Sequence, residues 1–436
     1  MIVPLHAMNS AYYRRELPES EVLYVATEKG VAAFNLLDTY GDEKSDPPPG
    51  QVLTPAADEA LAVMDGFALP AADEGGIKPG ALTLAYLGPQ DARVYAADTK
   101  RLRIFSVDGV NKAHPTAPEH GFAPADPVTE SGARFFHLDA AYGLSPLYAV
   151  PPTPPPPLPR WVYASLTTLN APHGFPSGTN PTSGIAIVDV GTAGAVASDP
   201  LTTVSRKWLY RHGSVSANPL VKVAYFGGVT SVPITQQEHV LYVAYGALPG
   251  NPVYHEQGAG IAVLRAYLEV VETVPPPEQV LTWVPRIELV GLFPATNDAS
   301  CDRALPGLVT YEPGVPGVAN LSKRLMVGLG CNGFAIYRIP DTPGGMFAPV
   351  LEAFVNENSI FNVLPGPLSA AGNPYFYVSN LNQGLTLFEL LPAGLVKRAK
   401  YATSFQLGQL VFADNRNRIF SPDMRGGISL YELTYP

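Results

Sequence analysis

The stretch YVATEKGVAAFNL (24–36) decides the fold, because its pattern occurs seven times along the chain. In each copy an apolar strand with a large central residue runs into a short turn. A second strand follows, in which apolar and other residues roughly alternate. The first strands centre on Tyr24, Tyr95, Tyr163, Tyr242, Met326, Tyr377 and Phe420. The second strands begin at Gly30, Arg101, Gly184, Gly260, Gly333, Gly384 and Gly427. A hairpin that recurs in this way predicts a repeat architecture.

Further strands are predicted between the hairpins. LVKRAKYAT (395–403) and LGQLVFA (407–413) precede the last hairpin, and RIELVGLF (286–293) and GLVTYEP (307–313) precede the fifth. Each repeat then has an inner strand, the two strands of the hairpin and an outer strand. A lone hairpin is marginal in water, so the repeats must pack on one another. Four-stranded antiparallel sheets repeated around an axis form a β-propeller. The sequence therefore predicts an all-β, seven-bladed propeller of four-stranded antiparallel blades, forming a single domain over 1–436.

The two ends of the chain predict how this ring closes. The sequence stops soon after the last hairpin, so the seventh blade lacks an outer strand, and MIVPLHAM (1–8) could supply it. We therefore expect the N- and C-terminal strands to pair within one blade. The alternative is a three-stranded last blade with residues 1–18 packed as a cap. Loop insertions are expected near 38–80, 109–132, 143–160, 166–183 and 246–259.

The composition excludes some classes of protein. Charged residues make up 15% of the chain, against roughly 25% in an average globular protein. A net charge of −10 without a lysine- or arginine-rich run argues against a nucleic-acid partner. The sequence has no apolar segment long enough for membrane insertion, and its N-terminus lacks the pattern of a secretory signal.

The hairpins resemble the repeats of LVIVD-type propellers. The segments 24–36, 377–390 and 419–433 come closest, and the pattern is more distantly similar to lactonase-type seven-bladed propellers. The first resemblance implies the architecture and little about activity, because propellers host many unrelated functions. The second implies a metal site of acidic and amide residues at the ends of inner strands. The residues near such ends are Asp139, Asp298, Asn356 and Asn415.

Two long loops within hairpins, 166–183 and 246–259, belong to adjacent blades and predict a binding rim. The polar and aromatic residues that they bring to this rim are Asn170, His173, Asn180, Tyr254, His255 and Glu256. Loops on a rigid scaffold commonly carry function. The alternative is a pair of surface insertions, which cost little entropy.

The sequence offers no motif for a catalytic residue, a cofactor or a metal. The eight histidines, His137 among them, form no H-x-H, H-x-x-x-H or H-E-x-x-H spacing. No nucleophile elbow, phosphate-binding loop or dinucleotide-binding motif is present. We therefore predict none of these groups. A single divalent metal in the central channel, with ligands from several blades, stays open.

The two cysteines, Cys301 and Cys331, are expected in loops on the same face of the fifth blade. They could then reach the short Cα separation that a disulfide requires. Two free thiols are the alternative. A bond would indicate an oxidising setting or a thermophilic source.

These features predict a non-catalytic structural or binding propeller that acts as an interaction scaffold for protein partners in a larger assembly. Few charges and proline-rich loops suit a virion component, such as a tail or capsid-surface piece, or an extracellular assembly more than a cytoplasmic protein. A metal-dependent lactonase or hydrolase with its site in the central channel is the alternative. A propeller that binds glycans through tyrosines on its loops is a third hypothesis.

Overall fold

The computed structural model describes most of the strands and few of the long loops. The described residues are 7–17, 20–27, 30–35, 60–64, 83–87, 93–97, 102–106, 134–145, 160–167, 182–190, 202–211, 225–246, 258–274, 280–296, 307–315, 318, 321–381, 383–401, 408–413, 418–423 and 427–433. Apart from a 3₁₀ turn, η2 (Gly345–Phe347), their regular structure is β. Among them there is no helix of the length and hydropathy that a membrane crossing needs.

The predicted hairpins are all formed. They pair β2 (Ser20–Thr27) with β3 (Gly30–Asn35), β6 (Arg93–Ala97) with β7 (Leu102–Ser106), β9 (Arg160–Thr167) with β10 (Thr182–Asp189), β13 (Glu238–Gly246) with β14 (Ala259–Val274), β17 (Arg324–Gly328) with β18 (Phe334–Arg338), β21 (Pro374–Asn380) with β22 (Gly384–Leu391), and β25 (Arg418–Asp423) with β26 (Gly427–Glu432). The central residue of each first strand is at most 2% exposed. Such burial fits strands whose two faces are both covered by protein.

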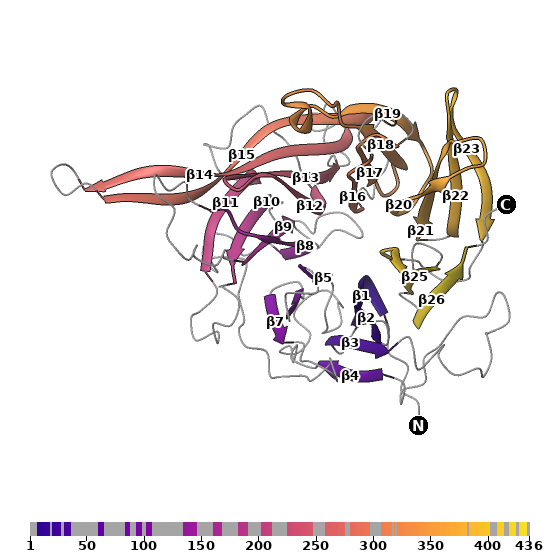
Figure 1. The fold of residues 1–436 in the computed structure, drawn as a ribbon, viewed down its shortest axis with the longest axis horizontal. Helices are drawn as coiled ribbons and strands as arrows, with labels where there is room; N and C mark the ends of the chain where they lie inside the picture. The colour runs from indigo at the N-terminus through magenta and orange to yellow at the C-terminus, as the bar shows by residue number, and fades with distance from the viewer. Residues whose placement is uncertain are drawn as a thin grey trace, which may run out of the picture.

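Each hairpin has a strand on its inner side, and five hairpins have one on the outer side. The inner strands are β1 (Ala7–Leu17), β5 (Thr83–Ala85), β8 (Arg134–Tyr142), β12 (Tyr225–Thr235), β16 (Val309–Glu312), β20 (Ile360–Leu368) and β24 (Val411–Ala413). The outer strands are β4 (Ala60–Met64), β11 (Thr202–Arg211), β15 (Val280–Thr296), β19 (Val350–Val355) and β23 (Gly394–Tyr401). Figure 1 shows the sheets following one another around a centre, which is a β-propeller.

The number of complete blades differs from the prediction. The described residues form five four-stranded blades, not seven, and the sheets β5-β6-β7 and β24-β25-β26 have three strands each. After β7 the chain enters 107–133, and after β26 it enters 434–436; both segments lie outside the described residues. The predicted insertions also lie largely outside the described residues, although β4 falls within 38–80.

The predicted pairing of the two termini in one blade is not seen in the described part of the chain. Ala7 and Met8, the end of the expected donor strand, belong to β1, where Ala7 pairs with Thr27 of β2. Residues 1–6 lie outside the described residues. The first and last sheets are nevertheless neighbours, because β1 contacts β24 and β25 on one side and β5 on the other (Figure 1).

Glycines allow the backbones of neighbouring blades to touch. The amide of Gly228 donates to the carbonyl of Gly307 at 2.8 Å, and the amide of Leu308 donates to the carbonyl of Phe361 at 2.7 Å. A Cβ atom at Gly307 would lie 2.0 Å from that Phe361 oxygen, and one at Gly328 would lie 2.3 Å from it. These contacts join the blades that contain β12, β16 and β20, and larger side chains would force them apart.

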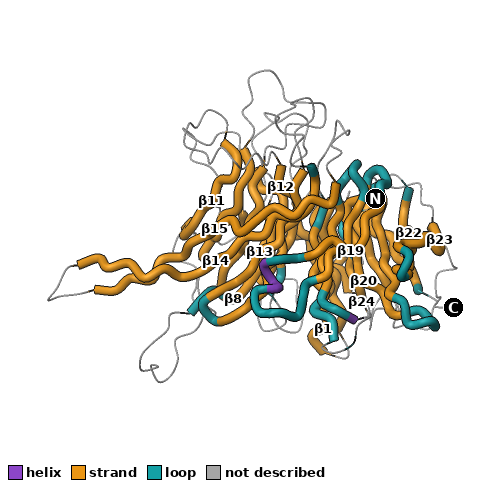
Figure 2. Tube along the Cα trace, turned by 90° about the horizontal axis from the view of Figure 1, so that it is seen from above, coloured by secondary structure: helices purple, strands orange, loops and turns teal. Residues whose placement is uncertain are grey.

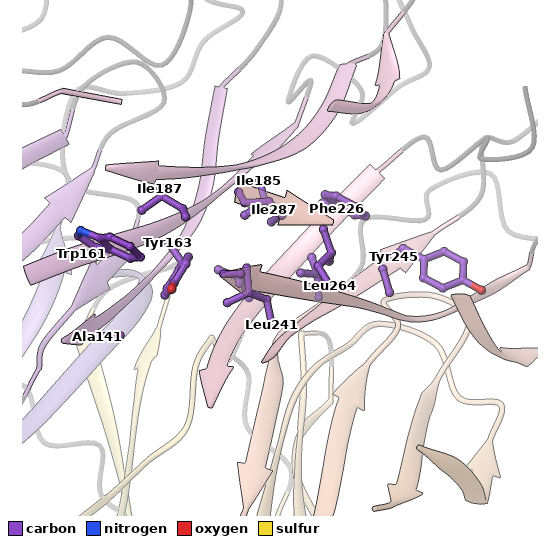
Figure 3. Close-up of a cluster of buried hydrophobic side chains, with 14 of the residues drawn as sticks. Ala141, Trp161, Tyr163, Ile185, Ile187, Phe226, Leu241, Tyr245, Leu264 and Ile287 are labelled. Atoms are coloured by element: carbon purple, nitrogen blue, oxygen red, sulfur yellow. The ribbon is translucent and has the colours of Figure 1, made fainter. Parts of the chain in front are cut away.

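The hydrophobic core lies between successive blades. Figure 3 shows one such layer, in which Tyr163 and Ile187 from one blade meet Leu241 and Leu264 from the next. All four side chains are fully buried. Burying one side chain of this size contributes about 1.5–3 kcal/mol, so the interfaces between blades hold the ring together and fix the inner strands around the axis.

Candidate functional site

A cavity of about 310 Å³ lies among the inner strands. Its walls come from β8, β12, β16 and β20 and from the residues just before β24. The polar side chains that line it include His137, Asp139, Ser231, Thr310, Asn362 and Gln409. We call this space the central cavity. It is the candidate site, because polar groups from several blades meet there.

Asp139 on β8 is the carboxylate of the central cavity. Its Oδ2 accepts hydrogen bonds from the backbone amide and the hydroxyl of Ser231 on β12, both at 2.6 Å. Burial raises the pKa of Asp139 to about 6, although the bonds from Ser231 and from the Ala140 amide act in the opposite direction. Near neutral pH the group is therefore mostly ionised, and it fastens one blade to the next.

His137 is two residues earlier on the same strand, so it lies on the same face. Its Nδ1 accepts a hydrogen bond of 3.2 Å from the amide of Val229 on β12. Burial lowers the pKa of His137 to about 4. The ring is therefore neutral at physiological pH and does not balance the charge of Asp139.

Asn362 on β20 occupies the equivalent place in a later blade. Its Nδ2 donates to Thr310 Oγ1 at 3.2 Å, and its Oδ1 accepts from the amide of Leu410 at 2.9 Å. This one side chain therefore connects three blades.

The strands that carry His137 and Asn362 share a backbone feature. Each residue follows an irregularity in the pairing of its inner strand. The amide of His137 donates to Ser165 Oγ at 3.1 Å, and that of Asn362 donates to Ser379 Oγ at 2.9 Å. The repeat therefore presents a polar side chain to the axis by the same local geometry in both blades.

Tyr163 pairs with Asp139 across β8 and β9, and its side chain contacts His239. The Tyr163 hydroxyl is 2.8 Å from Nδ1 of His239. Burial, and after it the charge of Asp139, raises the pKa of Tyr163 well above its usual value. Burial lowers the pKa of His239 to about 4. Both groups are therefore uncharged near neutral pH, and they add no positive charge beside Asp139.

The predicted binding rim falls outside the described residues. Asn170, His173, Asn180, Tyr254, His255 and Glu256 all lie there, so this site stays a prediction.

The expected channel residues have mixed outcomes. Asp139 lines the central cavity. Asn356 does not, because it follows the outer strand β19 and is exposed. The prediction for Asn356 was wrong since it mistook an outer strand for an inner one. Asp298 and Asn415 lie outside the described residues.

The expected disulfide also stays a prediction. Cys331 lies in the turn between β17 and β18, as predicted, whereas Cys301 lies outside the described residues.

Sequence reasoning missed Ser231 and Asn362 and gave His137 no role. The available signal was a polar residue inside an otherwise apolar inner strand, as in SIFNVLP (359–365). Spacing motifs could not find these residues, because each comes from a different blade. Among the described residues, no three His, Cys, Asp or Glu side chains gather as a metal site would require.

Comparisons with known proteins leave the family open. No protein-family model and no curated protein matches the chain. A solved structure, the periplasmic gluconolactonase of Pseudomonas aeruginosa, aligns with 100% of this chain and 93% of its own at 12% identity and a TM-score of 0.45. A likeness this distant says nothing about what the present chain binds. The resemblance to LVIVD-type repeats likewise stays a prediction.

Proposed function

We propose that this protein is a non-catalytic interaction scaffold, and that it engages a protein partner through the hairpin of β14 and β15. These two strands have 16 and 17 residues. The hairpin reaches well beyond the ring as a two-stranded arm (Figures 1 and 2). This projecting arm is the observation that carries the proposal.

The arm begins where the rest of the blade ends. β13 pairs with β14 only as far as Tyr267, which lies opposite Glu238. From Leu268 to Val274 the pairing of β14 is with β15 alone. Two-stranded ribbons are at best marginally stable by themselves. An arm held out in this way is therefore a candidate for stabilisation by another molecule.

The two faces of the arm differ in chemistry. Leu268 pairs with Pro285, and Val270 pairs with Trp283. Directly paired residues lie on the same side of a ribbon, so these four side chains form one apolar face, which starts at Leu268 against the core between blades. Val270 is 45% exposed.

The opposite face carries charge. It includes Glu269, which accepts a 2.5 Å hydrogen bond from Arg286 Nε, beside the apolar side chains of Val271 and Val284. At the base of the arm, where β13 still pairs, the ring centre of Tyr267 lies 4.8 Å from the guanidinium carbon of Arg265. An apolar face backed by charged groups suits a protein surface with its own apolar groove. Aromatic and aliphatic anchors usually carry most of the energy of such contacts.

The test is affinity capture from the source organism with the native chain and two variants. Val270→Thr with Trp283→Thr removes the apolar face while keeping residues that favour strands. Glu269→Gln with Arg286→Gln alters the opposite face and serves as the matched control. The proposal requires one partner to be retained by the native chain and the control and lost from the apolar-face variant. A partner retained equally by all three proteins would contradict it.

Two finer points belong to the same proposal. We infer that the three-stranded sheets β5-β6-β7 and β24-β25-β26 are the other two blades of a seven-bladed ring, since each has the inner strand and hairpin of the five complete blades.

We also infer that the scaffold works in a larger assembly, on a virion or outside a cell. Low charge content and the exposed apolar arm support this setting.

A further inference from the structure

We propose that the central cavity binds a small organic ammonium ion, with Asp139 as its counter-ion and the neutral groups around it as further hydrogen-bond acceptors. This inference concerns the centre of the ring and is independent of the arm. The negative charge of Asp139 has no positive partner among the described residues of the site.

The carboxylate of Asp139 is partly buried and lines the central cavity. The described hydrogen bonds to this carboxylate come from Ser231 and Ala140, which are neutral donors. The described lining residues include no lysine or arginine. Charges taken out of bulk water are normally paired or bound to a cation.

The titratable groups near Asp139 do not supply that positive charge. His137 on the same strand and His239 behind it are both neutral because burial lowers the pKa of each. Tyr163 and Tyr311 can only be neutral or negative. Lys323, whose charge acts on Tyr311, is bonded to Asp341 at 2.9 Å. At neutral pH, where Asp139 is mostly ionised, a cation bound in the central cavity would balance its charge.

The chemical groups that line the central cavity favour an organic cation over a metal ion. Among the described residues, a single carboxylate and a single imidazole line it, together with hydroxyl and amide groups. These are too few anionic ligands for a typical divalent site. The hydroxyl of Thr310 and the amide oxygen of Gln409 are of the type that accepts ammonium N–H bonds.

The remaining space suits a short carbon chain. Leu308, Leu364 and Leu410 supply apolar wall beside the polar groups. The volume of about 310 Å³ is at the lower end of the range for small-molecule sites, roughly 300–1,000 Å³. The site therefore fits a primary alkylammonium ion better than either a larger cofactor or a lone metal.

The experiment titrates the full-length chain with propylammonium chloride, followed by calorimetry or ligand-observed NMR. 1-Propanol, which has nearly the same shape without the charge, is the neutral probe. Calcium, magnesium and zinc chlorides are the metal probes, and sodium chloride controls for ionic strength. We expect saturable binding of propylammonium, with 1-propanol binding about ten-fold or more weakly, because one charge-assisted hydrogen bond is lost.

Three variants localise the binding. Asp139→Asn should weaken propylammonium binding about ten-fold or more. Glu269→Gln removes an equal charge at an exposed position on the arm and should leave the affinity unchanged. Thr230→Leu keeps Asp139 and fills part of the cavity, so it should also weaken binding. Near-ultraviolet circular dichroism checks that each variant is folded.

Several outcomes would overturn the proposal. The absence of saturable propylammonium binding to the native chain would do so. Equal affinity for 1-propanol would make this a site for neutral molecules. Tighter binding of a divalent metal, displacing the ammonium ion, would make it a metal site. Binding that survives both Asp139→Asn and Thr230→Leu would place the ligand elsewhere.

Discussion

At the residue scale, Asp139 links the central cavity to the stability of the whole chain. The folded protein holds the proton of this carboxyl more tightly than the unfolded chain, since its pKa is about 6 in place of 3.8. Its contribution to the free energy of unfolding therefore falls as pH rises between these two values and is constant above them. A shift of about two units corresponds to ~3 kcal/mol.

His137 and His239 act in the opposite direction. Their pKa values of about 4 lie below the usual 6.5. The stability linked to each neutral ring is present above the usual value and is lost as pH falls through the lowered one. The total pH dependence therefore mixes opposing effects, and only a comparison of variants isolates Asp139.

The first prediction concerns Asp139→Asn. The free energy of unfolding of the native chain minus that of the variant should decrease by up to ~3 kcal/mol as pH rises from about 4 to about 6. Urea unfolding across this pH range measures the difference. A difference that does not change with pH would contradict the raised pKa.

The second prediction concerns the close approach of neighbouring blades. Gly328→Ala places a Cβ atom 2.3 Å from the carbonyl oxygen of Phe361, which is backbone and cannot move aside alone. We expect a loss of about 1–3 kcal/mol or more in thermal or urea unfolding. Gly291→Ala is the control, because its Cβ would meet only the ring of Phe293, at 3.2 Å. Similar losses in the two variants would rule out backbone contact as the cause.

At the scale of single elements, ion pairs between strands should contribute to the free energy of unfolding according to how deeply they are buried. Arg324 on β17 reaches across β18 to Glu352 on β19, with Nε–Oε2 and Nη2–Oε1 distances of 2.8 and 3.1 Å. The Arg324 side chain is only 7% exposed. In contrast, the Arg286–Glu269 pair on the arm is nearly half exposed on both sides.

The third prediction is that Glu352→Gln destabilises the chain more than Glu269→Gln does. Removing the charge of Glu352 takes a two-bond ion pair from the buried guanidinium of Arg324, at a cost of about 1–3 kcal/mol. The exposed pair is worth about 0–1 kcal/mol. Urea unfolding at neutral pH compares the two. Equal effects would show that burial does not set the value of these pairs.

The fourth prediction concerns the arm. Amides of β14 beyond Tyr267 belong to a two-stranded ribbon, whereas those of Ile261 to Ala266 lie between β13 and β15. The outer amides should exchange with solvent faster, because local opening of a ribbon disrupts few buried contacts. Hydrogen exchange with mass spectrometry measures this. Equal protection along β14 would mean that the arm is covered in the free protein.

At the scale of the whole molecule, β1 joins the beginning of the ring to its end. It pairs with β2 and also contacts β5, β24 and β25. Removing it would uncover the first and last sheets together.

The fifth prediction follows from this position. Deleting residues 1–17 should abolish cooperative thermal unfolding and expose apolar surface, as measured by calorimetry and dye binding. Replacing the arm between Leu268 and Pro285 with a short turn is the control, and it should leave the unfolding transition nearly unchanged. A cooperative transition after the β1 deletion would show that the ring does not depend on this strand.

The sequence by itself determined the repeating hairpin, its buried centre and the all-β class. These follow from local alternation of apolar residues, which acts over a few neighbours along the chain. Tyr24 and Tyr377 could be placed in the core in this way, and both are buried. The sequence alone could not determine the number of complete blades or the strand with which β1 pairs, because strand pairing joins distant segments of the chain.

Only the tertiary structure decided what lies at the centre. Asp139 meets Ser231 across 92 positions of sequence, and Asn362 meets Leu410 across 48. No local pattern encodes such contacts, because each depends on how one blade packs against the next. The same holds for the arm. Its apolar residues indicate a strand, but how far the arm extends beyond the blade depends on where β13 ends.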